Sequence, residues 1–393
     1  MSSLLEGVRI LAVHHDSGLN GAGLLFHSIL EGLAKNYGAS VFQTFPQEGP
    51  LVARAKDLGP VEVGDLPRRR FFGRRRRGAA RGTYDLIFAN TIASLPLVER
   101  IMDERYAALS ALPLVVYVHE SHFWLHTGDF GATTRMLRHA RLIFAVSPSV
   151  RETLEEVIKP SARIAIVSGF VLERSPTSEA HEPPPVLGAA IRSGAKIIGG
   201  IGTMAPYKGT DLFLAVALRI RQLLPLQQLK FMWIGREQHL DIRRLLEHDI
   251  ERAGLREVVA LPGGMENPTS FFESLSLFLL PSREDSWPLV MLEAAAAGVP
   301  MVCFQRSGGA EIFVANGGGT AVPYLDVEAM AQAAVRYLSE PELMARDSGI
   351  ARQLAGGVTP EGQIGKIASE LAQMLKSPSP GSASPGVNSA LGG

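Results

Sequence analysis

The stretch "PSREDSWPLVMLEAAAAGVPMVCF", residues 281–304, decides the fold of the second half of the chain. The apolar run that ends at Leu280 predicts a buried strand, and a polar turn follows it. The next segment predicts a helix from about Pro288 to Ala297, and Gly298 is well placed to end that helix. A second apolar run, "VPMVCF", then predicts the next strand. This order of strand, helix and strand is typical of a parallel sheet.

Two carboxylates in this stretch lie eight residues apart. Asp285 falls in the turn and Glu293 falls about one and a half turns inside the predicted helix. Because a helix N-terminus presents free N–H groups, the turn suits a phosphate. An ionised carboxylate only accepts hydrogen bonds, so both acids suit sugar or ribose hydroxyls. Taken alone, an ordinary capped helix with a solvated carboxylate explains the pair equally well.

The same alternation of apolar runs and amphipathic segments fills the rest of the chain. It predicts βαβ units and parallel sheets in both halves. The runs that predict strands cover residues 8–13, 39–45, 84–90, 112–120, 140–147, 162–168, 196–202, 229–235, 257–261, 276–282, 299–304 and 318–323.

A length of 393 residues predicts two domains. The proline-rich segment "SPTSEAHEPPP" (175–185) interrupts the pattern and indicates a linker. The final segment is rich in Ser, Pro and Gly, a composition typical of disorder. We therefore expect an N-terminal domain over 1–176, a linker over 177–188, a C-terminal domain over 189–360, a C-terminal helix over 361–376 and a disordered tail over 377–393.

Composition excludes several classes of protein. Basic and acidic residues number 39 each, and the single cysteine, Cys303, allows no internal disulfide or cysteine-rich zinc site. We see neither a signal peptide nor an apolar run long enough to span a membrane. We therefore expect a protein of the reducing cytoplasm.

Two further loops in the second half follow predicted strands. In "GIGTMAPYKGTDLF" the strand ends near Gly202, and Lys208 with Gly209 precedes a helix, where an ammonium suits a pyrophosphate. In "SGGAEIF", Gly308 and Gly309 expose backbone N–H groups at a helix start. A surface lysine beside a turn and a tight structural turn are the plain alternatives.

The first half offers two candidate loops. "DSGLNGAG" (16–23) follows the first strand, but its glycine order is not that of a dinucleotide fingerprint, which argues against a nicotinamide enzyme. "VYVHESHFWLH" (116–126) holds His119, His122 and His126, yet its spacing is not H-E-x-x-H and no carboxylate cluster accompanies it. The sequence therefore favours no metal site.

These motifs together resemble the family 4 glycosyltransferases. The resemblance is carried by "EDSWPLVMLEA", "GIGTMAPYKGTDLFL", "FMWIG", "SGGAEIFV" and "GTAVPYLDVEAMA", and it covers roughly residues 198–337. It implies an α/β chain of GT-B fold, with two Rossmann-like, doubly wound parallel-sheet domains facing a central cleft. It also implies a retaining, nucleotide-sugar-dependent transferase whose acceptor lies on the first domain.

The resemblance also implies residue roles. Glu293 would hold the ribose of the nucleotide and Asp285 would contact the donor sugar, although the family usually has Glu at that first position. Lys208 would bind the leaving phosphate, while Thr203 and Tyr207 occupy the places of the usual partner arginine. His119 would face the sugar, so we expect Lys208, His119 and Asp285 to be catalytic. The other expected donor-binding residues are Gly21, Gly202, Gly235, Trp287, Pro288, Leu289, Gly308 and Gly309.

Neither a cofactor nor a metal is expected, since no D-x-D turn suits a manganese–nucleotide bridge. The expected partners are the nucleotide sugar and a glycan or lipid-linked acceptor. A nucleotide-sugar epimerase on the same scaffold and a non-catalytic nucleotide-sugar-binding protein are the open alternatives. The sequence does not specify the base, the sugar or the acceptor.

The segment "RRRFFGRRRRGAARG" (68–82) concentrates eight arginines in one loop of the first half. Phe71 and Phe72 interrupt the run, so the segment suits an anionic membrane surface, with both rings entering the interface. A solvated loop is the alternative; nucleic acid is disfavoured because no recognised module accompanies the run. A membrane and acceptor patch on the inner face of the plasma membrane would consist of Arg68, Arg69, Arg70, Phe71, Phe72, Arg74, Arg75, Arg76 and Arg77.

Overall fold

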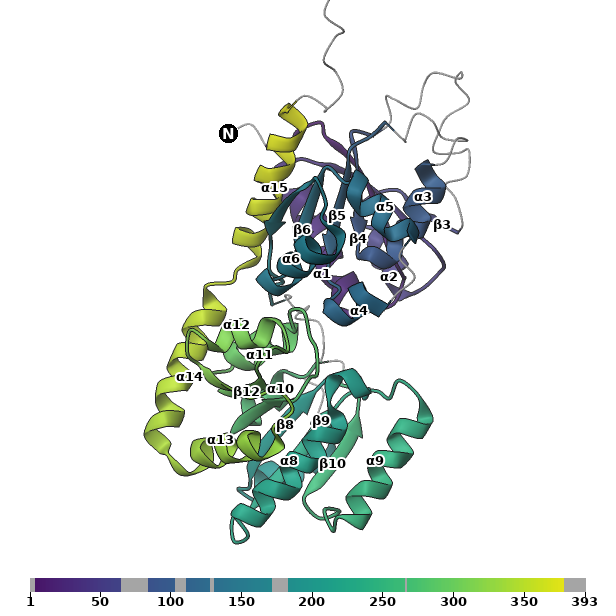
Figure 1. Cartoon of the computed structure of the whole chain (residues 1–393). Helices are drawn as coiled ribbons and strands as arrows, with labels where there is room; N and C mark the ends of the chain where they lie inside the picture. Colours follow the sequence, from purple (N-terminus) through teal and green to yellow (C-terminus); the bar gives the residue numbers. More distant parts are fainter. Residues whose placement is uncertain are drawn as a thin grey trace, which may run out of the picture.

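The computed structural model describes residues 4–64, 84–102, 111–127, 131–171, 183–265 and 267–377. These residues form two lobes, each built on its own parallel sheet (Figure 1). The first sheet has seven strands and the second has six. The prediction of two doubly wound parallel-sheet units is therefore confirmed.

The first sheet has the order β3-β2-β1-β4-β5-β6-β7, so the direction of winding reverses between β1 and β4. β4 and β5 are buried at every position because helices cover both faces, which explains their uninterrupted apolar sequences. The short β3 was not predicted from the sequence. The strands are β1 (Arg9–Val13), β2 (Ser40–Phe45), β3 (Val61–Val63), β4 (Leu86–Asn90), β5 (Leu114–Val118), β6 (Leu142–Ala145) and β7 (Arg163–Ile166).

The helices of the first lobe begin at the ends of these strands. In α1 the Asn20 side chain accepts a hydrogen bond from the N–H of Gly23, and Gly38 ends the helix at φ 78°, as its position in the sequence predicts. The helices are α1 (Gly21–Tyr37), α2 (Pro50–Lys56), η2 (Ile92–Ser94), α3 (Leu95–Met102), α4 (His122–Thr127), α5 (Gly131–His139), α6 (Pro148–Thr153) and the π-helical turn η4 (Leu154–Ile158).

The second sheet has the order β10-β9-β8-β11-β12-β13, and its winding reverses between β8 and β11. Its strands are β8 (Lys196–Ile201), β9 (Leu229–Ile234), β10 (Val259–Gly263), β11 (Leu277–Leu280), β12 (Met301–Phe304) and β13 (Gly319–Val322). Its helices are α7 (Pro185–Arg192), η5 (Pro206–Lys208), α8 (Thr210–Leu223), α9 (Leu240–Arg252), α10 (Thr269–Ser274), α11 (Leu289–Ala296), α12 (Gly309–Val314), α13 (Val327–Ser339) and α14 (Pro341–Gly356).

Three segments singled out by the sequence fall wholly or partly outside the described residues. The arginine-rich segment 68–82 lies outside them, and so do residues 378–393 of the expected tail. Residues 177–182 of the expected linker are also outside, but the rest of that stretch runs into α7. Pro185 is the first residue of α7, a position where a proline is tolerated, and Leu187 is fully buried in the second lobe.

The last helix, α15 (Pro360–Lys376), lies against the first lobe although it follows the second in sequence (Figure 1). Ile364, Ile367 and Leu371 are part of the core of the first lobe. Gly32 of α1 makes room for this helix, because a Cβ there would lie 2.6 Å from Ile364 Cδ1. Near the start of α15, Gln363 Oε1 accepts a hydrogen bond of 3.1 Å from the N–H of Ser168.

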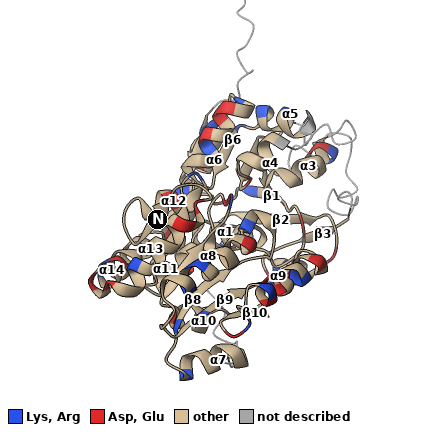
Figure 2. Cartoon of the chain, turned by 60° about the horizontal axis from the view of Figure 1, so that its bottom comes forward, with Lys and Arg blue, Asp and Glu red and all other residues tan. Residues whose placement is uncertain are grey.

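Charged residues of both signs are interspersed on the outer helices. Figure 2 shows basic and acidic residues together on α9 and α14. On α9, Arg243 Nε lies 2.8 Å from Glu247 Oε1. Such a pair four residues apart is ordinary on the solvated face of a helix. Within the part of the chain that the structure describes, no helix is both long and apolar enough to cross a bilayer.

Candidate active site

The loops that follow β8 and β11 meet where the winding of the second sheet reverses. Ligands of open parallel sheets bind at such points, beyond the carboxyl ends of the strands. Here Lys208 Nζ lies 2.5 Å from Asp285 Oδ2, and the two side chains are 23% and 12% exposed. Two residues predicted separately from the sequence therefore form one ion pair.

Two glycines allow these loops to approach so closely. Gly209 has φ 70°, and a Cβ there would lie 1.9 Å from the carbonyl oxygen of Pro281. Gly308 has φ 114°, and its Cβ would lie 2.2 Å from the carbonyl oxygen of Asp285. The loop after β12 is in turn tied to Asp285, whose N–H donates to Ser307 O at 2.7 Å and whose carbonyl accepts from the N–H of Gly309 at 3.0 Å.

Two further glycines expected at the donor site, Gly202 and Gly235, also belong to this cluster. Gly202 directly follows β8, and a Cβ there would lie 3.7 Å from the Cδ atom of Lys208. Gly235 ends β9, with its backbone packed against the carbonyl oxygen of Gly202. The structure thus brings the carboxyl ends of β8, β9, β11 and β12 together around Lys208 and Asp285.

The start of α11 reaches the first lobe. Pro288 precedes this helix, and no side chain caps its N-terminus. Trp287 Nε1 donates to Gly169 O at 2.9 Å, and Leu289 packs against the core of the first lobe. A Cβ at Gly21, the first residue of α1, would lie 3.8 Å from Leu289 Cδ1. The helix starts after β1 and β11 therefore face each other.

Glu293 lies in the middle of α11 and is partly buried. Its position on the helix places it more than one turn beyond the loop that carries Asp285. The two acids of the sequence motif therefore belong to the same strand–loop–helix unit, Asp285 in its loop and Glu293 in its helix.

Arg283 and Glu284 are two charged residues of this loop that the sequence did not single out. The Arg283 guanidinium contacts both carboxylate oxygens of Asp211 on α8, at 2.9 and 2.8 Å. This ion pair raises the pKa of Arg283 and lowers the pKa of Asp211, against an opposing effect of burial on each. Glu284 points the other way and accepts from the N–H of Phe123 on α4, at 2.9 and 3.0 Å. The sequence carries no signal for a contact between positions so far apart.

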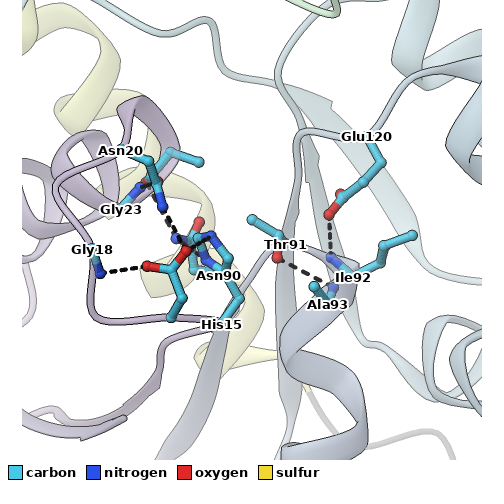
Figure 3. A network of polar contacts seen from close by, with 11 residues as sticks. His15, Gly18, Asn20, Gly23, Asn90, Thr91, Ile92, Ala93 and Glu120 are labelled. Atoms are coloured by element: carbon cyan, nitrogen blue, oxygen red, sulfur yellow. Dashed lines mark hydrogen bonds and ion pairs between the residues drawn. The ribbon is translucent and has the colours of Figure 1, made fainter. Parts of the chain in front are cut away.

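A second polar cluster lies at the corresponding place in the first lobe, where β1 and β4 end (Figure 3). Asp16 holds the loop after β1 together, because Oδ1 accepts from the N–H of Gly18 at 2.6 Å and Oδ2 accepts from Asn20 Nδ2 at 2.7 Å. Asn20 Oδ1 then accepts from Gly23 at the start of α1. The glycine-rich loop is thus ordered by its polar side chains.

His15 and Asn90 connect this loop to β4. Asn90 Nδ2 lies 3.4 Å from His15 Nδ1 and donates to Ala22 O at 3.2 Å. His15 Nε2 lies 3.3 Å from Asp16 Oδ2. Since an amide Nδ2 can only donate, Nδ1 of His15 is the acceptor and Nε2 carries the proton. Burial lowers the pKa of His15, with Asp16 opposing that effect.

His119 is placed at the end of β5, close to this cluster. Its Nε2 is shielded from solvent and has no hydrogen-bond partner within the described chain. Burial, with a smaller contribution from His15, lowers the pKa of His119 to about 3. The neighbouring Glu120 accepts from the N–H groups of Ile92 and His119 at 3.0 and 3.1 Å, and burial raises its pKa. His119 is therefore a neutral imidazole on an anchored segment.

The three expected catalytic residues come from both lobes. Lys208 and Asp285 touch one another in the second lobe, whereas His119 belongs to the first. The bond from Phe123 to Glu284 links the segment after His119 to the residue before Asp285.

Two of the three histidines noted in the sequence lie on α4, the helix that Glu284 contacts. His122 and His126 stack with ring centroids 3.7 Å apart. In the described segments no group of three or more His, Cys, Asp or Glu side chains could hold a metal ion, and the expectation of a metal-free site stays a prediction. A cavity of about 890 Å³ lies near the amino ends of β5 and β6, at the other edge of the first sheet.

Comparison with known proteins identifies the second lobe. Residues 195–340 match the family model of "Glycosyl transferases group 1". This part of the chain is similar to the group 1 glycosyltransferases. Its span contains Lys208, Asp285 and Glu293, which agrees with the family resemblance predicted from the sequence.

The curated relatives that resemble this chain are matched over only part of their own length. The lipopolysaccharide core biosynthesis mannosyltransferase LpcC of Rhizobium leguminosarum bv. viciae is 29% identical over 154 residues, 38% of this chain and 43% of the relative. The D-inositol 3-phosphate glycosyltransferase of Corynebacterium urealyticum is 29% identical over 208 residues, 51% of this chain and 49% of the relative. The matched region thus spans less than half of either relative.

Solved structures resemble both lobes. The crystal structure of Anabaena Alr3699/HepE in complex with UDP and glucose has a TM-score of 0.74 and 19% identity, and the match covers 93% of this chain and all of the other. At 19% sequence identity, this similarity shows a shared fold alone. The GT-B architecture expected from the sequence is therefore confirmed.

Proposed function

We propose that this chain is a retaining glycosyltransferase that moves a sugar from a nucleoside-diphosphate sugar to a hydroxyl of a glycan or lipid-linked acceptor. The observation that carries the proposal is the pair of Lys208 and Asp285 at the reversal point of the second sheet. The relatives named for lipopolysaccharide core biosynthesis support a role in surface-polysaccharide assembly.

The donor would bind across the carboxyl ends of β8 and β11. The Lys208 ammonium would contact the diphosphate, and the uncapped N-terminus of α11 would offer N–H groups to it. Glu293 on the same helix would accept hydrogen bonds from the ribose hydroxyls, because a carboxylate only accepts. The similar crystal structure of Anabaena Alr3699/HepE, which contains UDP and glucose, supports a uridine nucleotide sugar as the first donor to test.

The reaction would depend mainly on stabilising the leaving group. When the bond between the anomeric carbon and the phosphate oxygen breaks, its electron pair stays on the phosphate and the sugar becomes oxocarbenium-like. Lys208 would stabilise that negative charge. The acceptor oxygen would form the new bond on the same face and pass its proton to the departing phosphate. Neutral His119 would offer a hydrogen bond to the sugar without adding charge next to the cation. This mechanism requires no metal.

We place the acceptor on the first lobe, beside the loop ordered by Asp16. We also propose that the arginine-rich segment 68–82 docks on anionic lipid at the cytoplasmic membrane face. Co-sedimentation with vesicles tests that docking, and equal binding to neutral and anionic vesicles would contradict it.

A lysine substitution tests the central proposal. Lys208→Ala should lower kcat on the order of 10²-fold, comparable to the loss of one oxyanion donor. Turnover is measured by nucleotide release from a panel of UDP-, GDP- and dTDP-sugars. Lys366→Ala, an exposed lysine on α15, is the matched control and should retain full activity. A Lys208→Ala enzyme with normal turnover would refute the assignment.

A further inference from the structure

The loop between β11 and α11 places three consecutive charged side chains in three directions. Arg283 binds Asp211 within the second lobe, and Asp285 binds Lys208 at the donor site. Glu284, between them, binds a backbone N–H of the first lobe. Arg283 and Asp285 thus fix this loop to the second lobe, so that Glu284 can hold the first lobe in place.

The group that Glu284 contacts belongs to the first turn of α4. N–H groups in a first turn lack a partner inside their helix, and the partial positive charge there suits a carboxylate. Both oxygens of Glu284 lie within hydrogen-bond distance of the N–H of Phe123. Figure 1 shows α4 at the end of the first lobe that faces the second.

This contact acts on the segment that carries His119. Only three residues separate His119 from Phe123. Glu120, which lies between them, also holds this segment. Its carboxylate accepts hydrogen bonds from the N–H groups of His119 and Ile92. The end of β5 is thus fixed to the first lobe by one carboxylate and to the donor-site loop by another.

Trp287 and Leu289 make further contacts between this part of the second lobe and the first lobe. Trp287 packs against the cores of both lobes and donates to Gly169 O, and Leu289 packs beside it. These contacts lie next to Ser168, where α15 joins the first lobe. They are well suited to act as a pivot, whereas the bond to α4 fixes the angle between the lobes.

We propose that Glu284 is a positioning residue that closes the two lobes over the donor site by docking the N-terminus of α4. Its proposed role is to hold the lobes together rather than to bind the donor or the acceptor. It sets the distance between His119 and the pair formed by Lys208 and Asp285, so its removal lets the first lobe turn about Trp287. The catalytic consequence rests on the proposed function, while the closure itself does not.

Distances between spin labels test the closure in the full chain. Glu152→Cys on α6 and Leu226→Cys after α8 place labels on exposed positions of the two lobes, and the natural Cys303 is buried and remains unlabelled. Glu284→Ala should broaden the distance distribution and add longer distances. Glu284→Gln, which keeps an oxygen acceptor, should restore most of the narrow distribution. Glu273→Ala, an exposed acid on α10, is the control that should leave it unchanged.

Kinetics supply the second measurement. Glu284→Ala should lower kcat about tenfold, the scale of one hydrogen bond to a charged group, and should leave the Kd for UDP or GDP within about twofold. An unchanged distance distribution in Glu284→Ala overturns this inference even if the chain transfers sugar. If Glu284→Ala changes the distance distribution but the chain shows no transferase activity, the inference of closure stands and the proposed function is refuted.

Discussion

At the residue scale, the contacts of the candidate site join side chains from distant positions in the chain. Lys208 and Asp285 each stand out by position after a strand, but they are 77 positions apart and their pairing depends on which strands are neighbours. Glu284 lacks any local signal, because its partner lies 161 positions away. The types of side chain follow from local pattern, whereas their contacts follow from the order of strands in the sheets.

His14 gives a prediction for pH at the same scale. It is fully buried, stacks on Phe45 at 4.0 Å and lies 3.1 Å from Gln43 Oε1. Burial lowers the pKa of His14 to about 3, whereas the unfolded chain has the ordinary value of about 6.5. Between these values the unfolded state binds the extra proton, so stability is lost as pH falls from about 6.5 toward about 3.

Between about pH 7 and about pH 4.5, the protonation of His14 in the unfolded state should lower the free energy of unfolding by roughly 3 kcal/mol. His14→Phe should therefore flatten the dependence of the unfolding free energy on pH, although the lost contact with Gln43 lowers stability at neutral pH. His248→Ala, on the exposed face of α9, should leave the slope unchanged. Urea unfolding at the two pH values measures this, and equal slopes for wild type and His14→Phe would contradict the assignment.

At the scale of elements, the sequence predicts most strands and the helices that follow them. The apolar runs before Lys208 and before Asp285 became β8 and β11 because both are buried between layers of helices. β3 was missed because three partly buried residues carry too little apolar pattern. α7 was partly assigned to a linker because its prolines suggest a break, whereas Pro185 only starts the helix.

Two glycine-to-alanine substitutions should change stability in opposite directions, because Gly308 lies at a close approach between loops and Gly349 lies in an open helix. Gly308→Ala should destabilise the second lobe by at least about 2 kcal/mol, because its Cβ would meet the Asp285 carbonyl at a positive φ. Gly349→Ala, inside α14 with open space around it, should instead stabilise the chain by about 0.5–1 kcal/mol. Thermal unfolding of both variants measures the two effects, and similar shifts in Tm would rule out the close-approach explanation.

At the scale of the whole molecule, the first lobe is built from two segments of the chain that lie on either side of the second lobe in sequence. Part of the core of the first lobe comes from α15, which is synthesised after the entire second lobe. α1 and α15 pack together although more than 320 positions separate their nearest ends, Tyr37 and Pro360. Contacts of such large separation in sequence are slow to form and cannot be recognised from local patterns.

Truncating one buried side chain of α15 tests how far the first lobe depends on it. Ile367 is fully buried in that core, so Ile367→Ala should cost about 2–5 kcal/mol, mostly in the first lobe. Amide hydrogen exchange should quicken in β4 and β5 and stay unchanged in β8 and β11. Lys366→Ala changes the exposed neighbour on the same helix and should affect neither sheet. If both sheets exchanged faster to the same extent in Ile367→Ala, the two lobes would unfold as one cooperative unit and α15 could not be assigned to the first alone.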